Sequence, residues 1–332
     1  MLYLYLGIKN HINKKIYFLI ILIILIIKEY YFYKYYKYCL KCINDYEKSP
    51  KCLQCPVQLI FKGIKILSND ETLDEIINKN KSISRFGDGE FKLIIGGHNG
   101  FQKANKFLAN KLLEVLNIKD KGFLVGINLP FQNKMLKKLK RHSQKYWTKY
   151  FNKYKFRIAK IFKNKKYYSG TISRFYLAYK DKTNIPKYIK KLKKIWDQKD
   201  ILIIEGEKSR LGIGNDLFNN TKSIKRIICP IKNAFKVYDK IINSVLKCNE
   251  KRLILLALGP TATILSYDLY KLGYQSVDVG HVDIEYEWFL RNATHKIQIE
   301  NKYVNEAHGK RYNFTKVKDK KYYSQIIAKI IN

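Results

Sequence analysis

The sequence predicts an α/β fold in which a mostly parallel sheet is covered by helices on both faces. Two continuous apolar runs, 201–204 and 253–258, are each followed by a glycine-containing loop and then by a helical pattern. Strands that are apolar along their whole length are typical of a parallel sheet buried on both faces. The chain has 332 residues, 46% of them hydrophobic, and only 6 prolines and 17 glycines, so it can build a large core.

Basic residues outnumber acidic ones by a wide margin. The chain carries 65 Lys and Arg against 27 Asp and Glu, which gives a formal net charge of +38 at pH 7. Its lysines run from residue 9 to residue 329 among Ile, Asn and Tyr, a pattern that favours a bias of the whole sequence over one binding patch. The charge attracts nucleotide phosphates and acidic lipid headgroups. A nucleic-acid-binding or processing protein stays open as the alternative function, although nucleic acid is not the expected partner.

The N-terminal region, residues 1–36, contains an apolar segment. Residues 16–27 (IYFLIILIILII) are twelve consecutive apolar positions, fewer than the roughly 20 that a spanning helix requires. No small-residue cleavage site follows, and the tyrosine-rich stretch 30–36 is typical of a membrane interface. Hydropathy therefore predicts an uncleaved, single-pass N-terminal anchor over 16–33. The flanking lysines slightly favour a cytoplasmic C-terminal body.

Four cysteines follow in residues 37–56. Cys39, Cys42, Cys52 and Cys55 form two C-x2-C pairs separated by nine residues. Paired C-x2-C units predict a structural zinc site with four thiolate ligands. Two disulfides, or reduced thiols near the membrane that are open to acylation, remain as alternatives.

The segment after residue 56 has the periodicity of an α/β body. Helical spacing predicts a helix over 71–80 with Asn69 or Asp70 as its cap, and apolar runs predict strands. The further helices are expected over 58–67, 103–116, 135–161, 185–196 and 264–272, and the strands over 122–127, 168–177, 200–205, 223–229 and 252–258. The helix over 135–161 is strongly basic and is the best place for a polyanion-binding face, although a solvated face is the simpler interpretation.

The stretch 84–91 (SRFGDGEF) is the first candidate site. Asp88 and Glu90 lie one residue apart among glycines, and Arg85 lies three positions upstream of Asp88. Two carboxylates this close repel each other unless a cation lies between them or a proton is shared. Oxygen ligands of this kind suit Mn²⁺ or Mg²⁺ together with substrate phosphates, and Arg85 can pair with a phosphate or with one of the acids. A solvated Asp-Gly turn is the alternative.

Two loops at the carboxyl ends of predicted strands are candidates for phosphate binding, because such loops present backbone N–H groups at a helix N-terminus. Neither loop is a G-x-G-x-x-G or a Walker A sequence. Thr261 or Thr263 can alternatively serve as a simple N-cap. The residues concerned are Gly212, Gly214, Asn215 and Asp216 in the first loop and Gly259, Thr261 and Thr263 in the second.

A third cluster of polar residues lies near the C-terminus. His281, Asp283 and Glu285 alternate with apolar residues, so on a strand they share one face. At a strand end they can supply a metal ligand and a general base. An edge strand with a polar outward face is the alternative.

Six motifs in this order resemble those of the GT-D-fold glycosyltransferases, long known as a domain of unknown function in bacterial glycosylation clusters. The motifs are SxSRFGDGEF, EGExSRLGxGNDLF, CPxKNAF, LALGPTAT, DxGHxDIEYEW and KYVNE. The resemblance covers about residues 67–305. It implies one Rossmann-like catalytic domain, placed at 57–310 and followed by a basic tail over 311–332.

The resemblance also implies an activity. The family takes a sugar, expected here to be a hexose, from a nucleotide-diphosphate donor that is typically a UDP-sugar, and the acceptor is expected to be a glycan or glycoprotein. Its D-x-E motif, which binds a divalent metal and the donor, falls on Asp88 and Glu90. Arg85 is implied on the donor side, and His281, Asp283 and Glu285 are implied as the catalytic cluster.

Overall fold

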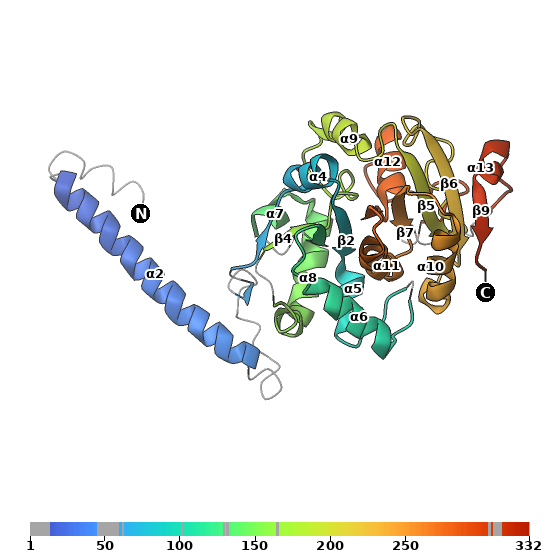
Figure 1. The fold of residues 1–332 in the computed structure, drawn as a ribbon. Coiled ribbons are helices and arrows are strands. Elements are labelled where there is room, and N and C mark those ends of the chain that lie inside the picture. The colour runs from blue at the N-terminus through green and yellow to red at the C-terminus, as the bar shows by residue number, and fades with distance from the viewer. Residues whose placement is uncertain are drawn as a thin grey trace. The chain divides into compact units, whose positions relative to one another are not determined.

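The computed structural model describes residues 14–44, 60–61, 63–100, 102–128, 130, 133–163, 166–304, 307 and 314–331. The chain divides into two compact units, and the larger one comprises residues 63–153 and 161–332. Within its described residues, nine parallel strands form one sheet in the order β1-β4-β3-β2-β8-β7-β5-β6-β9 (Figure 1). The predicted mostly parallel α/β fold is therefore confirmed. The strands are β1 (Lys65–Ile66), β2 (Ser82–Phe86), β3 (Phe123–Ile127), β4 (Lys166–Ser169), β5 (Asp200–Gly206), β6 (Ser223–Cys229), β7 (Leu253–Ala257), β8 (Ser276–Asp278) and β9 (Ile326–Lys329).

Helices pack on both faces of this sheet. Because side chains alternate along a strand, Ile201 and Ile203 of β5 enter one buried cluster and Leu202 and Ile204 enter another. The first cluster is completed by α4, α9 and α12, and the second by α10 and α11. Figure 1 shows these two groups of helices on opposite sides of the strands. The helices of the larger unit are α4 (Asn69–Asn78), α5 (Asp88–Ile94), α6 (Lys106–Leu116), α7 (Asn133–Lys138), α9 (Ile185–Lys193), η2 (Ala234–Val237), α10 (Tyr238–Lys247), α11 (Pro260–Lys271), α12 (Val282–Leu290) and α13 (Lys320–Ser324), while α8 (Arg141–Ala159) ends in the smaller unit.

Local chemistry fixes where α4 begins. Ser68 accepts from the Glu71 backbone N–H at 3.2 Å, and Glu71 accepts from the Ser68 N–H at 2.8 Å. This reciprocal pair satisfies two N–H groups that the first turn would otherwise leave without partners. The predicted caps, Asn69 and Asp70, are therefore wrong by one or two residues.

Five expectations differ from the structure. Residues 65–66 form β1 rather than the end of a helix over 58–67, and β4 ends at Ser169. The helix expected over 135–161 breaks between α7 and α8, where the Lys140 N–H donates to the Ala178 carbonyl. The helix expected over 264–272 begins earlier, at Pro260. Part of the predicted C-terminal tail joins the sheet, because β9 pairs with β6.

The strand order creates a switch point between β2 and β8. The chain leaves β2 toward β3 on one side, whereas it leaves β8 toward β9 at the far edge of the sheet. Open α/β sheets bind ligands outside the carboxyl ends of strands at such a point. Asp88 follows β2 and His281 follows β8, so both residues lie at this edge.

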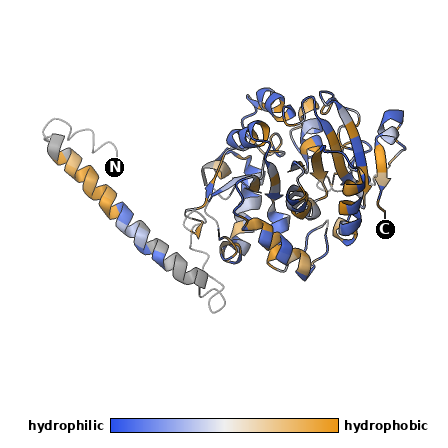
Figure 2. Cartoon of the chain, viewed as in Figure 1, coloured by the Kyte–Doolittle hydropathy of each residue, from blue (hydrophilic) through white to orange (hydrophobic). Residues whose placement is uncertain are grey.

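The apolar N-terminal segment lies in the helix α2 (Lys14–Asn44) (Figure 2). Its side chains from Ile21 to Ile27 are 40–60% exposed. Among the residues that the structure describes, no helix has both the length and the apolar character needed to cross a bilayer. The predicted single-pass anchor over 16–33 is therefore not supported.

The predicted zinc ligands fall at the end of α2 and beyond it. Cys39 and Cys42 belong to the helix, and Cys52 and Cys55 lie outside the described residues, so the zinc site stays a prediction. Cys229 is the last residue of β6 and is buried in the core, and this burial raises the pKa of its thiol to about 12.

Candidate functional site

The acidic pair lies in the first turn of a helix. Gly87 has an extended backbone, with φ −97° and ψ −172°, and it caps α5, which begins at Asp88. Glu90 turns back and accepts from the Gly87 N–H at 2.7 Å. The stretch is thus an ordered strand-to-helix junction and not a solvated turn.

Asp88 lies in a partly exposed contact with two other elements. Its Oδ2 accepts from Lys92 Nζ at 3.1 Å and from the Tyr146 hydroxyl. The Tyr150 hydroxyl donates to the Asp88 backbone carbonyl at 3.2 Å. Helix α8 therefore holds the start of α5 through two tyrosines one turn apart. The carboxylate of Asp88 remains 35% exposed and accessible to a ligand.

Negative charge is concentrated around Glu90. Burial raises the pKa of Glu90 to about 7. Hydrogen bonds from backbone N–H groups oppose this shift, whereas the nearby acids Asp88 and Asp278 add to it. Burial also raises the pKa of Asp278, even though Arg85 opposes the shift. A divalent cation would relieve this repulsion, and magnesium-type sites commonly use one or two carboxylates completed by substrate phosphates. The residues present therefore fit a Mn²⁺ or Mg²⁺ ion. Within the described residues, no group of three His, Cys, Asp or Glu side chains forms an all-protein metal site.

Arg85, in β2, links the two strands of the switch point through contacts with Asp278 of β8. Its Nε donates to the Asp278 carbonyl at 2.6 Å, and its Nη2 contacts Asp278 Oδ1 at 2.8 Å. Its Nη1 donates to Ser173 Oγ at 2.6 Å and to the Gly170 carbonyl at 3.2 Å. Gly280 makes room for this side chain, because a Cβ there would lie 1.9 Å from Arg85 Nη2 and the glycine has φ +43°. In this structure the guanidinium therefore binds the protein itself and links β2 to the end of β8 and to the segment after β4.

The second predicted phosphate loop opens α11. Gly259 precedes Pro260, and the first helical turn contains Thr261 and Thr263. Thr263 donates to the Arg85 carbonyl at 3.0 Å, so it links α11 to β2. Thr261 is fully buried, and its hydroxyl has no hydrogen-bond partner among the described residues. A buried hydroxyl without a partner is unusual, which makes this helix start the better of the two phosphate candidates.

The first predicted phosphate loop is occupied by the protein itself. The Gly212 N–H donates to Asp283 Oδ1 at 2.9 Å, and Asn215 Nδ2 donates to Asp283 and to Glu287 at 2.8 and 2.7 Å. Asp216 accepts from the Tyr286 hydroxyl at 2.5 Å and pairs with Lys193 at 2.9 Å. These groups fold the loop against α12 and α9.

The predicted strand with His281, Asp283 and Glu285 on one face is wrong, because β8 ends at Asp278 and α12 begins at Val282. Asp283 and Glu285 are 1% and 2% exposed. Asp283 pairs with Lys302 at 2.7 Å, while Glu285 accepts from the Tyr176 and Leu177 N–H groups at 2.9 Å each. The two acids therefore support different segments, and the structure does not bring the three residues together. His281, partly exposed, precedes α12 at the switch point.

Two residues next to the acidic pair were not predicted. Lys92 contacts Asp88 from the next turn of α5, and Tyr146 reaches it from α8 across 58 positions of sequence. The contact of Lys92 with Asp88 could have been predicted, because residues four positions apart are neighbours on a helix. Nothing in the sequence distinguishes Tyr146 from the other tyrosines of the chain, which has 27 in total.

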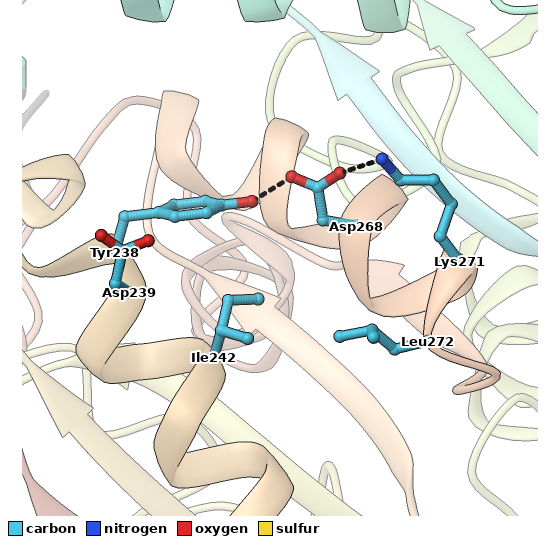
Figure 3. A pocket seen from close by; sticks show the side chains of 6 residues that line it. All are labelled: Tyr238, Asp239, Ile242, Asp268, Lys271 and Leu272. Carbon is cyan, nitrogen blue, oxygen red and sulfur yellow. Dashed lines mark hydrogen bonds and ion pairs between the residues drawn. The ribbon is translucent and has the colours of Figure 1, made fainter.

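A separate cavity of about 380 Å³ lies between α10 and α11 (Figure 3). Its polar side chains bind each other: Asp268 accepts from the Tyr238 hydroxyl and pairs with Lys271 at 2.6 Å. Asp268 and Lys271 lie in the C-terminal part of α11, whereas the switch point lies at its N-terminus. None of the predicted site residues lines this cavity.

Replacement of Glu90 by Gln is expected to stabilise the metal-free protein at pH 8 by about 2 kcal/mol and to have little effect near pH 4.5. The folded-state pKa of Glu90 is raised, so the native protein binds more protons than the unfolded chain between these pH values and loses stability as pH rises. Gln keeps an oxygen that can accept from the Gly87 N–H. Urea unfolding in a chelator at both pH values measures the difference; an equal effect at both would contradict the raised pKa.

Comparisons with known proteins agree with this architecture. The family described as "Glycosyltransferase GT-D fold" matches residues 83–307. The chain is 39% identical over 270 residues to "Probable glycosyl transferase Gly" of Streptococcus gordonii, covering 81% of this chain and 39% of that protein. It is 37% identical over 281 residues to "Glycosyltransferase GlyD" of Streptococcus pneumoniae serotype 4, covering 84% of this chain and 34% of that protein. The chain therefore spans less than half the length of these relatives.

Solved structures show the same fold. A structure described as "A New Glycosyltransferase (DUF1792) from Streptococcus sanguinis" is similar with a TM-score of 0.76 and 38% identity, covering 80% of this chain and 99% of that one. Another, described as "The highly conserved domain of unknown function 1792 has a distinct glycosyltransferase fold", has a TM-score of 0.77 and 38% identity, with coverage of 83% and 98%. The match over 83–307 begins in β2 and includes the acidic pair, the switch point and α12. The chain belongs to the GT-D-fold family of glycosyltransferases.

Proposed function

We propose that the chain transfers a sugar from a nucleotide-diphosphate donor, a UDP-sugar in the first instance, to a glycan or glycoprotein acceptor. The observation that carries the proposal is the pair Asp88 and Glu90 at the β2–β8 switch point, where burial and neighbouring acids raise the pKa of Glu90. That excess of negative charge favours a divalent cation, and the cation in turn favours a diphosphate.

Each group at this edge has a separate proposed role in glycosyl transfer. Asp88 and Glu90 would hold Mn²⁺ or Mg²⁺, which neutralises charge on the diphosphate leaving group. The start of α11, with the Thr261 hydroxyl, would receive a phosphate oxygen through backbone N–H groups. His281 lies at the same edge and is the proposed base for the acceptor hydroxyl. Asp283 and Glu285 are proposed to position the surrounding segments, because both are buried in contacts with the protein.

A donor screen tests the proposal. In a thermal-shift assay with and without Mn²⁺, the correct nucleotide sugar is expected to raise the melting temperature, and a hundredfold excess over Kd corresponds to about 2.7 kcal/mol of stabilisation. The shift should be largest with nucleotide and metal together. No shift with any nucleotide diphosphate sugar, combined with a shift by oligonucleotide, would favour the nucleic-acid alternative.

We also propose that the exposed apolar segment of α2 associates the protein with a membrane. The side chains from Ile21 to Ile27 would leave water on contact with lipid, a favourable transfer. Flotation of the full chain with lipid vesicles, compared with a chain starting at Gly63, tests this proposal; equal flotation of both would contradict it.

A further inference from the structure

Helix α8 carries a regular row of basic side chains. Arg141, Lys145, Lys149 and Lys153 recur at every fourth position and are all exposed. Side chains four residues apart lie about 6 Å apart along a helix, so the row extends for about 18 Å and winds around α8 by about a third of a turn. Like charges at this spacing weaken a helix by roughly 0.2–0.5 kcal/mol for each pair. The row therefore lowers the stability of α8 as an isolated helix.

The general lysine richness of the chain does not explain this row. The sequence has 27 Asp and Glu residues, yet none lies between Asp120 and Asp181. Two of the four lysines on α9 form ion pairs: Lys191 pairs with Asp74 at 2.9 Å and Lys193 with Asp216 at 2.9 Å. No ion pair from Arg141, Lys145 or Lys149 to a described residue occurs, and α8 contains no acid of its own. The acidic residues of the chain are thus absent from α8 and its sequence neighbours, and Asp88 contacts the helix through two tyrosines and not through the basic row.

The row lies beside the acidic pair. Tyr146 and Tyr150, the two residues of α8 that bind Asp88, each follow a member of the row by one position. Adjacent positions on a helix are turned by about 100°, so the row flanks the side of α8 that meets the start of α5. A long anion bound along the row would therefore pass close to Asp88.

The shape of the α8 surface favours a soluble polymer as its binding partner and not a lipid bilayer. A helix that lies in a membrane interface exposes a broad apolar face. The apolar side of α8 is instead packed inside the protein, since Tyr150 and Phe151 are 4% and 1% exposed. Among the large hydrophobic side chains of α8, which the structure describes in full, only Tyr146 is exposed. A narrow basic row beside an aromatic side chain suits an acidic polysaccharide, whose charges repeat along one line.

We propose that this α8 row binds an acidic polysaccharide and directs it to the Asp88 site as the acceptor chain. The acceptor role rests on the proposed glycosyltransferase function, whereas the binding itself does not. It adds a substrate class to that function: an acceptor that carries repeated negative charge.

The test is binding of a labelled heparin octasaccharide to the full chain, measured by fluorescence anisotropy at low and physiological salt without donor or metal. The variant Arg141→Glu/Lys145→Glu/Lys149→Glu is expected to bind about ten- to a hundredfold more weakly. A matched variant, Lys236→Glu/Lys240→Glu/Lys247→Glu, changes the net charge equally at exposed positions of η2 and α10 and should retain binding to within about threefold. The neutral variant Arg141→Gln/Lys145→Gln/Lys149→Gln, with melting curves for all proteins, separates lost charge from lost folding.

Each outcome decides the proposal. Equal loss in the row variant and the matched variant would show attraction by net charge alone and overturn it. So would tighter binding of single-stranded DNA than of heparin, or a row variant that loses only anionic-vesicle binding, because the partner would then be nucleic acid or membrane. Specific loss of heparin binding, with neutral dextran not bound, supports it. Donor hydrolysis by the unmodified chain is measured separately, so a failed enzyme assignment is distinguishable from a failed binding site.

Discussion

Replacement of Asp88 by Asn is expected to reduce metal-dependent turnover of the sugar donor by about 10²–10³-fold. The carboxylate is 35% exposed, and its neighbours Lys92 and Tyr146 are polar, so the change removes charge without opening a cavity. Asn also tolerates a position at the start of a helix. Release of the nucleoside diphosphate in the presence of Mn²⁺ measures turnover, and thermal unfolding checks that the fold persists.

Asp70→Asn is the matched control for this variant. Asp70 also lies in the first turn of a helix, α4, and is exposed while pairing with Lys191. Its removal is expected to leave turnover within about twofold, because surface ion pairs contribute little. A comparable loss of turnover in both variants, or none in Asp88→Asn, would remove Asp88 from the reaction.

The largest loss of stability is expected from Lys302→Met. The Lys302 side chain is 4% exposed and contacts Asp283 at 2.7 Å and Glu287 at 2.9 Å, themselves 2% and 3% exposed. Removal of the cation leaves two buried carboxylates without their main partner, a change that typically costs about 3–5 kcal/mol. Lys79→Met, which removes a 60% exposed partner of Glu75, should cost less than about 1 kcal/mol. Urea unfolding of both variants measures the contrast.

The loss of folding stability in Lys302→Met is expected to depend on pH. Burial alone would raise the pKa of Glu287, but Lys302, Asn215 and Arg291 outweigh it and lower that pKa. The stabilisation is thus present above about pH 4.5 and is lost as pH falls. In Lys302→Met the buried Glu287 carboxylate loses the partner that lowers its pKa most, so the deficit should be smaller at pH 4.5 than at pH 7.5. A deficit independent of pH would indicate lost packing instead.

The sequence predicts the central strands well because their evidence is local. Continuous apolar runs mark β5 and β7, and burial on both faces of a parallel sheet requires such runs. The pattern that singles out Asp88 and Glu90, two acids separated by a single glycine, is also local, and their role as metal ligands stays a prediction. The structure places that pair after β2, at the carboxyl edge of the sheet, where open α/β sheets generally bind ligands.

The residues that were misassigned depend on distant partners. Alternation of His281, Asp283 and Glu285 imitates a strand, but the acids have buried partners that lie far away in sequence, such as Gly212 for Asp283 and Tyr176 for Glu285. Those contacts stabilise a helix in a segment with weak helical periodicity. The glycines at 212 and 214 likewise resemble a phosphate loop, yet the Gly212 N–H is satisfied by Asp283. Local patterns do not contain this information.

Calorimetric titration of UDP into the full chain, with and without Mn²⁺, tests the central claim most directly. The claim is that Asp88 and Glu90 hold a cation that also binds the donor diphosphate. The expected result is UDP binding that strengthens at least tenfold with Mn²⁺ in the unmodified chain and loses this metal dependence in Asp88→Asn. Binding of UDP with the same affinity in the presence and absence of metal, in both proteins, would contradict the claim.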